Sequence, residues 1–209
     1  MELHNFEFQT KELYKFQSKN ELVQNFSVIK QDRKSIVLYD FGQVKWIVMP
    51  KQEDDITLDK VELFTKRDSS RIMFLDRENE NIIIHEDICR LLTNNDIEKF
   101  EEFEKSCPKA DKSEGMVSLS DPIAYGCFVD DILVSMTSLW NWGDKLSDIG
   151  VLSHPDYRKH GYAESVVRTL MKNTDKVFIW RCDIENAQSY KLALKLGFKD
   201  AGMIYVLSN

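Results

Sequence analysis

The sequence predicts a protein of the α/β (α+β) class, and three observations support this. Apolar strand-like runs alternate with amphipathic helical stretches through the second half of the chain. A small-residue turn at Gly161 joins one such run to one such helix. Asn186 and Gly197 flank a later helical stretch, and these residue types favour the beginnings and ends of helices.

Residues 1–84 predict a small N-terminal α/β subdomain. It is expected to contain a helix, a two-stranded hairpin, a short helix and two more strands, at residues 11–26, 35–40, 44–49, 58–64, 71–75 and 81–85. This segment contains no phosphate loop and no catalytic constellation. We therefore expect a structural role, and the sequence leaves open whether the segment is a lid or the subunit contact of a homodimer.

The second domain is expected to span residues 85–209. Thr93 and Asp96 have the spacing of a capping box, which predicts that a helix begins there. Two apolar runs on either side of Asp130-Asp131 predict a hairpin. The apolar face of the first helix is expected to contain Ile97, Phe100, Phe103 and Cys107. The expected strands are 88–92, 122–129, 132–140, 148–152, 176–182 and 204–207.

The helix after Gly161 is expected to be amphipathic. Its apolar positions are Ala163, Val166, Val167, Leu170 and Met171. Its opposite, solvent-facing positions are Glu164, Ser165, Arg168, Thr169 and Lys172.

The turn before this helix, Arg158-Lys159-His160-Gly161-Tyr162-Ala163, suits a phosphate group. The first backbone N–H groups of a helix have no intrahelical partner, and the helix dipole places partial positive charge there. Gly161 lets the backbone approach an anion closely, while Arg158 and Lys159 add full charges. A pyrophosphate would satisfy these groups together.

Two segments resemble the signature motifs of the GNAT superfamily of N-acetyltransferases. One runs from Val151 to Ala163 and is similar to that superfamily's pyrophosphate-binding segment. The other runs from Asn186 to Phe198. The resemblance covers roughly residues 85–209 and implies a mixed, mostly antiparallel central sheet flanked by helices. It also implies acetyl-CoA as cosubstrate and direct attack of a primary amine on the thioester.

The resemblance further implies roles for individual residues. A backbone N–H near Val151 or Leu152 would meet the oxyanion. The cofactor-binding residues would be Val151, Leu152, Arg158, Lys159, His160, Gly161, Tyr162, Ala163, Asn186 and Ser189.

Proton transfer has its own candidate residues. Asp148 is the first candidate for the general base, with a solvated strand end as the alternative, and Asp183 and Glu185 after the neighbouring strand are further candidates. Many members of the superfamily carry a tyrosine acid where this chain has Ala193. Tyr190, three residues earlier, is the candidate substitute, with a packed core aromatic as the alternative. The departure at Ala193 leaves a second function class open, a coenzyme A-binding sensor or regulatory module without turnover.

The composition favours a cytoplasmic protein. A net charge of −7 over 209 residues disfavours nucleic-acid binding and mildly favours a cationic acceptor, which we expect to be a small-molecule or peptide amine. The sequence contains neither a long apolar run nor a signal-peptide pattern, so no membrane contact is expected. The four histidines lack metal-ligand spacing, so no metal is expected, and the four cysteines are expected to be reduced thiols.

Overall fold

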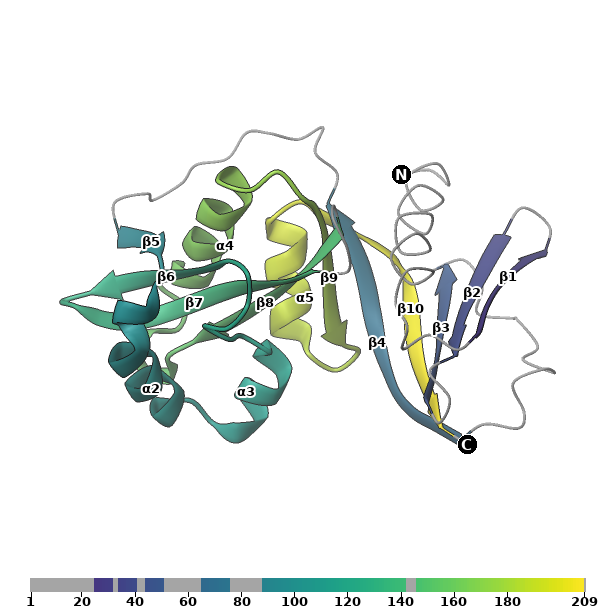
Figure 1. Ribbon diagram of the computed structural model, residues 1–209, viewed down its shortest axis with the longest axis horizontal. Coiled ribbons are helices and arrows are strands. Elements are labelled where there is room, and N and C mark those ends of the chain that lie inside the picture. Colours follow the sequence, from purple (N-terminus) through teal and green to yellow (C-terminus); the bar gives the residue numbers. More distant parts are fainter. Residues whose placement is uncertain are drawn as a thin grey trace. The chain divides into compact units, whose positions relative to one another are not determined.

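The computed structural model describes residues 25–31, 34–40, 44–50, 65–75, 88–141 and 146–208. These residues divide into two compact units. Figure 1 labels their helices and strands. The first unit contains the described residues up to 75 together with Leu146 and residues 179–208, and the second contains residues 88–141 and 147–178. Within the described part of the chain, no helix is long and apolar enough to cross a membrane.

The second unit is built on an antiparallel meander. Each strand pairs with the next one along the chain, in the order β5 (Cys89–Leu91), β6 (Ala124–Val129), β7 (Ile132–Asn141) and β8 (Leu146–Ser153). The hairpin between β6 and β7 turns at Asp130 and Asp131, whose φ angles are 48° and 67°. Left-handed angles at both positions match the twist of the flanking strands. The predicted hairpin is therefore confirmed.

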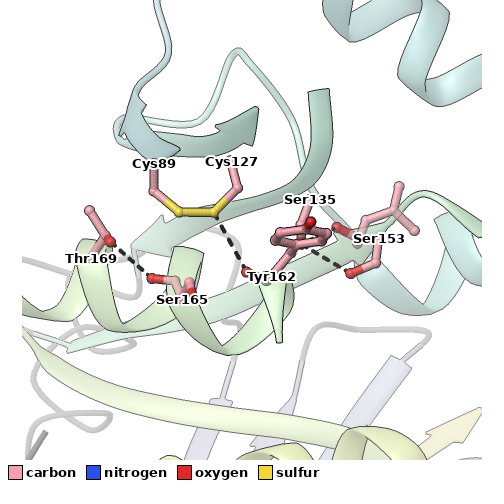
Figure 2. The surroundings of a disulfide bond; sticks show 8 residues. Cys89, Cys127, Ser135, Ser153, Tyr162, Ser165 and Thr169 are labelled. Carbon is pink, nitrogen blue, oxygen red and sulfur yellow. Dashed lines mark hydrogen bonds between the residues drawn. A yellow bond between two sulfur atoms is a disulfide. The ribbon is translucent and has the colours of Figure 1, made fainter. Parts of the chain in front are cut away.

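Helices cover both faces of this meander. The 3-10 helix η2 (Asn94–Asp96) leads into α2 (Ile97–Ser106), which is followed by α3 (Lys109–Gly115). α2 packs its Phe103 on the face that carries Met136 and Leu152. α4 (Tyr162–Lys172) contacts β6 and β7 on the opposite face, where Cys127 and Ser135 lie (Figure 2).

The described residues of the first unit form antiparallel strands and one helix. Its α5 (Ala187–Lys195) contacts the long C-terminal strand β10. The strand order is β1 (Asn25–Gln31), β2 (Lys34–Asp40), β3 (Val44–Pro50), β10 (Phe198–Ser208), β4 (Thr65–Leu75) and β9 (Val177–Asp183). β3 and β4 both pair with β10, so this pairing crosses the domain boundary expected after residue 84. The boundary itself stays a prediction. All strand pairs within the two units are antiparallel and helices flank them, which confirms the predicted fold class.

Several expected elements differ from the structure or lie outside it. Asn25 and Phe26 belong to β1 and not to the end of a helix, and the rest of the helix expected over 11–26 lies outside the described residues. The elements expected over 58–64 and 81–85 also lie outside them. The short polar helix α3 was not expected, because its sequence KADKSEG has no apolar periodicity.

Two expectations about burial are wrong. Ile97 is 48% exposed, because η2 occupies the first turn and the packed face of α2 begins only at Phe100. Ser165 and Thr169 are buried, although both were expected to face solvent. The Thr169 hydroxyl can be buried because it donates to the carbonyl oxygen of Ser165 at 2.9 Å.

The expectation that all four cysteines are reduced is wrong for two of them. Cys89 and Cys127 are directly opposite each other in the ladder of β5 and β6, and they form a disulfide. Cys107 and Cys182 are free and buried. Because 38 residues separate the bonded pair along the chain, only the strand register brings them together.

Two glycines let the end of α3 lie directly against β8. A Cβ on Gly150 would lie 2.7 Å from the carbonyl oxygens of both Gly115 and Met116. A Cβ on Gly115 would lie 2.7 Å from the carbonyl oxygen of Val151. Distances this short do not occur for real Cβ atoms, so only glycine permits this approach.

Arg90 and Asp96 fix the beginning of the η2–α2 segment. The guanidinium of Arg90 donates to both carboxylate oxygens of Asp96, at 2.6 and 3.0 Å. The backbone N–H of Thr93 donates to the same carboxylate at 2.9 Å, which completes the predicted capping box. These donors, Arg90 foremost, lower the pKa of Asp96 to about 2 against an opposing effect of burial.

We predict that Gly150→Ala destabilises the protein by about 1–3 kcal/mol, because the added methyl group collides with the backbone carbonyls of the last residue of α3 and of its C-cap, Met116. For a chain of this size each kcal/mol lowers the thermal midpoint by about 2–4 °C, which differential scanning calorimetry resolves. The exposed α3 variant Ser113→Ala is the control and should keep the wild-type midpoint. A wild-type midpoint for Gly150→Ala would contradict the close approach.

We also predict that the stabilising effect of Asp96 depends on pH. Its pKa is lower in the folded protein than its ordinary value of 3.8, so the unfolded chain binds the proton more tightly. The carboxylate therefore stabilises the fold above pH 4 by about 2 kcal/mol, and this contribution is lost as the pH falls from about 4 towards 2. Urea unfolding of wild type and Asp96→Asn should differ at pH 7, and about half of that difference should remain at pH 3. An equal difference at both pH values would argue against this role of the charge.

Candidate cofactor and active site

The register between β7 and β8 decides where the amides of β8 point. The N–H of His154 donates to the carbonyl of Val134 at 2.9 Å, so the next pair along the ladder, Ser135 and Ser153, is not hydrogen-bonded. Hydrogen-bonded and non-hydrogen-bonded pairs alternate along an antiparallel ladder. The N–H of Val151 is therefore directed away from β7, whereas that of Leu152 is directed towards it.

A short turn connects β8 to α4. The 3-10 helix η3 (Pro155–Tyr157) begins after His154, whose Nδ1 accepts from the N–H of Asp156 at 3.2 Å. Lys159 and Gly161 then take φ angles of 66° and 87°. Gly161 is the N-cap of α4, and the first intrahelical bond runs from the N–H of Ser165 to its carbonyl, at 3.0 Å. The amides before Ser165 have no acceptor within the helix.

The space in front of α4 is open. Apart from the two chain neighbours of Gly161, no atom of the described residues lies within 4 Å of the position that a Cβ on Gly161 would occupy. Lys159, His160 and Gly161 are exposed. Amide donors without a helical acceptor, the positive end of the helix dipole and room for close approach are the features that a phosphate group needs. The turn therefore fits the pyrophosphate of a coenzyme.

The side chains of the turn have partners of their own. Arg158 forms an ion pair with Asp111 of α3, and no sequence signal pointed to Asp111. The ring of His160 stacks on that of Tyr162, with centroids 5.8 Å apart. One strand–turn–helix connection thus brings together Arg158, Lys159, His160, Gly161, Tyr162 and Ala163. Their contact with a cofactor stays a prediction.

Asp148 lies in β8 upstream of this turn, and its exposed fraction is 4%. It is therefore not the solvated strand end that was its alternative. Alternation along β8 places it on the same face as Gly150 and Leu152. Trp140, directly across the ladder on β7, is 62% exposed. A buried carboxylate and an exposed indole are therefore neighbours at this end of the hairpin.

Asn186 and Ser189 lie in the first unit, at the beginning of α5. Asn186 is the N-cap, as its residue type predicts, and its side-chain oxygen accepts from the N–H of Ser189 at 3.0 Å. The hydroxyl of Ser189 accepts from the indole N–H of Trp180 at 2.9 Å. Both side chains are thus held in one orientation, and their predicted contact with a cofactor is untested.

Tyr190 also lies in the first unit and is bound to charged neighbours. Its hydroxyl donates to the carboxylate of Asp200 at 3.5 Å, and the guanidinium of Arg71 lies 4.7 Å from its ring centroid. Arg71 also donates to Asp200 at 3.3 Å. Ala193, where a tyrosine acid would stand in many GNAT enzymes, is fully buried. The role of Tyr190 as acid stays a prediction.

The described residues contain no group of three or more His, Cys, Asp or Glu side chains arranged to hold a metal ion.

Comparison with known proteins identifies the fold of this strand–turn–helix arrangement. A family model described as an acetyltransferase (GNAT) domain matches residues 84–199. No curated protein matches the sequence.

Solved structures share the fold at low sequence identity. A GNAT-family protein from Novosphingobium aromaticivorans is 16% identical with a TM-score of 0.51, over 79% of this chain and 74% of that one. An acetyltransferase of the GNAT family from Colwellia psychrerythraea is 13% identical with a TM-score of 0.53, over 69% and 57% of the two chains. A GCN5-related N-acetyltransferase from Sphaerobacter thermophilus is 11% identical with a TM-score of 0.52, over 73% and 55%.

Proposed function

Because the chain belongs to the GNAT acetyltransferase family, we propose that it transfers the acetyl group of acetyl-CoA to a primary amine by direct attack. The observation that carries this proposal is the open turn at Gly161, in front of the first amides of α4. These amides would bind the pyrophosphate of the coenzyme, with Lys159 adding positive charge. Arg158 is paired with Asp111. It could bind the phosphates only if this ion pair breaks or if its guanidinium contacts Asp111 and a phosphate at the same time.

The amide of Val151 is the proposed donor to the thioester oxygen. Its direction away from β7 supports this, whereas the amide of Leu152 is directed into the ladder. A backbone N–H in this position would stabilise the negative charge that develops on the oxygen as the amine attacks. It would need no particular side chain, so the residue type at 151 is not constrained by this role.

Asp148 is the proposed general base. An alkyl ammonium has a pKa of about 10.4, so at neutral pH the amine must lose a proton before it can attack. The carboxylate would take this proton directly or through water. Trp140 supports a cationic acceptor, because an ammonium group is attracted both to a carboxylate and to the face of an indole. We further propose that the acceptor is a small-molecule or peptide amine. We also propose that the protein acts in the cytoplasm and forms a homodimer.

A second candidate function is coenzyme A binding without turnover. The buried Ala193 and the engagement of the Tyr190 hydroxyl by Asp200 favour it, because neither offers an obvious proton to the leaving thiolate. A thiol with a pKa of about 8.5 needs only modest assistance to leave, so we prefer the enzyme.

The test is a thiol-release assay with acetyl-CoA and a panel of amines, combined with calorimetry of coenzyme A binding. We predict that Gly161→Glu abolishes both binding and turnover, because its carboxylate would occupy the position of the pyrophosphate. Ser113→Glu, which adds the same charge at an exposed position on α3, is the control and should bind normally. Unchanged affinity in Gly161→Glu would reject the site, and binding without thiol release for any amine would favour the second candidate.

We predict that Asp148→Asn lowers kcat by about 10²-fold or more and leaves the affinity for coenzyme A unchanged, because it removes the base without touching the phosphate turn. Steady-state kinetics with the best acceptor measures the first effect and calorimetry the second. Asp130→Asn, in the exposed hairpin turn, should be fully active. A kcat within twofold of wild type would show that another group takes the proton.

A further inference from the structure

The disulfide of the second unit lies against the beginning of α4 (Figure 2). The sulfur of Cys127 is 3.6 Å from the carbonyl oxygen of Tyr162, the first residue of that helix. Ser165 and Thr169, the two small polar residues buried on α4, belong to the surroundings of the same disulfide (Figure 2). The disulfide and the helix that begins at the phosphate turn are therefore in direct contact.

This contact changes its chemistry with the oxidation state of the cysteines. The distance of 3.6 Å is within the range of a hydrogen bond that a thiol donates to a carbonyl. A thiol at Cys127 carries the proton for that bond. A disulfide sulfur carries none, so the carbonyl of Tyr162 then faces only lone pairs.

The carbonyl of Tyr162 is coupled to the proposed phosphate site through one peptide group. The C=O of Tyr162 and the N–H of Ala163 belong to the same amide, and this N–H is one of those at the mouth of α4. A hydrogen bond accepted by the carbonyl polarises the amide and strengthens the bond that its N–H donates. A thiol at Cys127 would thus make Ala163 a stronger donor to an anion.

We propose that Cys89 and Cys127 form a thiol–disulfide switch in which the reduced form binds the coenzyme more tightly than the oxidised form. The proposal rests on the proposed function, because it takes the anion at the mouth of α4 to be the coenzyme pyrophosphate.

The redox step is ordinary thiol–disulfide exchange. Cys89 is 9% exposed and Cys127 is fully buried, so a thiolate of an external dithiol attacks the sulfur of Cys89. The bond between the two cysteines breaks, and Cys127 leaves and takes up a proton. The second thiol of the reductant then displaces Cys89, which also takes up a proton, and the dithiol becomes a cyclic disulfide. Two electrons and two protons reach the protein, and a disulfide oxidant reverses the step.

The first measurement counts thiols. Alkylation of the denatured, oxidised protein followed by mass spectrometry should modify two of the four cysteines, Cys107 and Cys182, and pretreatment with dithiothreitol should raise the number to four. Four reactive thiols after treatment with oxidised glutathione would overturn the proposal at once.

The second measurement is calorimetry of coenzyme A binding to both forms. We expect reduction to tighten binding of coenzyme A about threefold, because a thiol is a weak donor and acts here through one amide. Cys89→Ala keeps the Cys127 thiol but cannot form the disulfide, so it should bind tightly under both conditions. Cys127→Ser retains a donor and should resemble the reduced protein, whereas Cys127→Ala should resemble the oxidised one. Cys107→Ser, at a buried cysteine outside the disulfide, is the control and should keep the full redox response.

Equal affinity in the two wild-type forms, or tighter binding by the oxidised form, would overturn the switch. If neither form binds coenzyme A, the proposed function fails, and NMR decides the coupling alone. The carbonyl resonance of Tyr162 and the amide resonance of Ala163 should then match between reduced wild type and Cys127→Ser, and differ in Cys127→Ala. Identical resonances in the two variants would show that the sulfur does not act on this peptide group.

Discussion

The ladder between β7 and β8 is the constraint on which the candidate site depends. Its register is fixed by the hydrogen bond from His154 to Val134, and the hydroxyls of Ser135 and Thr137 bind the β8 carbonyls of Leu152 and Gly150. A shift of one residue would exchange the directions of the Val151 and Leu152 amides and move Asp148 to the other face of the sheet. The same register determines where β8 ends and where the turn to α4 begins. The proposed oxyanion donor, the proposed base and the proposed phosphate turn are therefore positioned together.

Much of this arrangement could be predicted from the sequence because its signals are local. The capping box at Thr93 and Asp96, the N-cap at Asn186 and the left-handed glycine at 197 each depend on a few neighbouring residues. The amphipathic pattern of α4 and the small-residue turn before it are local in the same sense. The family resemblance rests on these same segments, and for this reason the fold class and the position of the turn before α4 were predictable.

What could not be predicted depends on contacts between distant residues. The disulfide requires the register of β5 against β6, and the pairing of Arg158 with Asp111 requires α3, a helix without an apolar pattern. Tyr190 could be placed on a helix, but its contact with Arg71 depends on β4, which is far from it in the chain and pairs with β10. Burial of Ser165 and Thr169 likewise follows from what lies against α4 and not from their own polarity.

The indole of Trp180 offers an optical view of the beginning of α5. Its ring is almost completely buried, and its N–H is held by Ser189, which is itself bound to the N-cap Asn186. The emission of a buried tryptophan depends on the dipoles around its nitrogen. Any ligand that forms a new hydrogen bond with Ser189 or Asn186 would therefore change the emission wavelength or the quantum yield of Trp180. Occupancy of the ligand site could then be followed by intrinsic fluorescence, without a label.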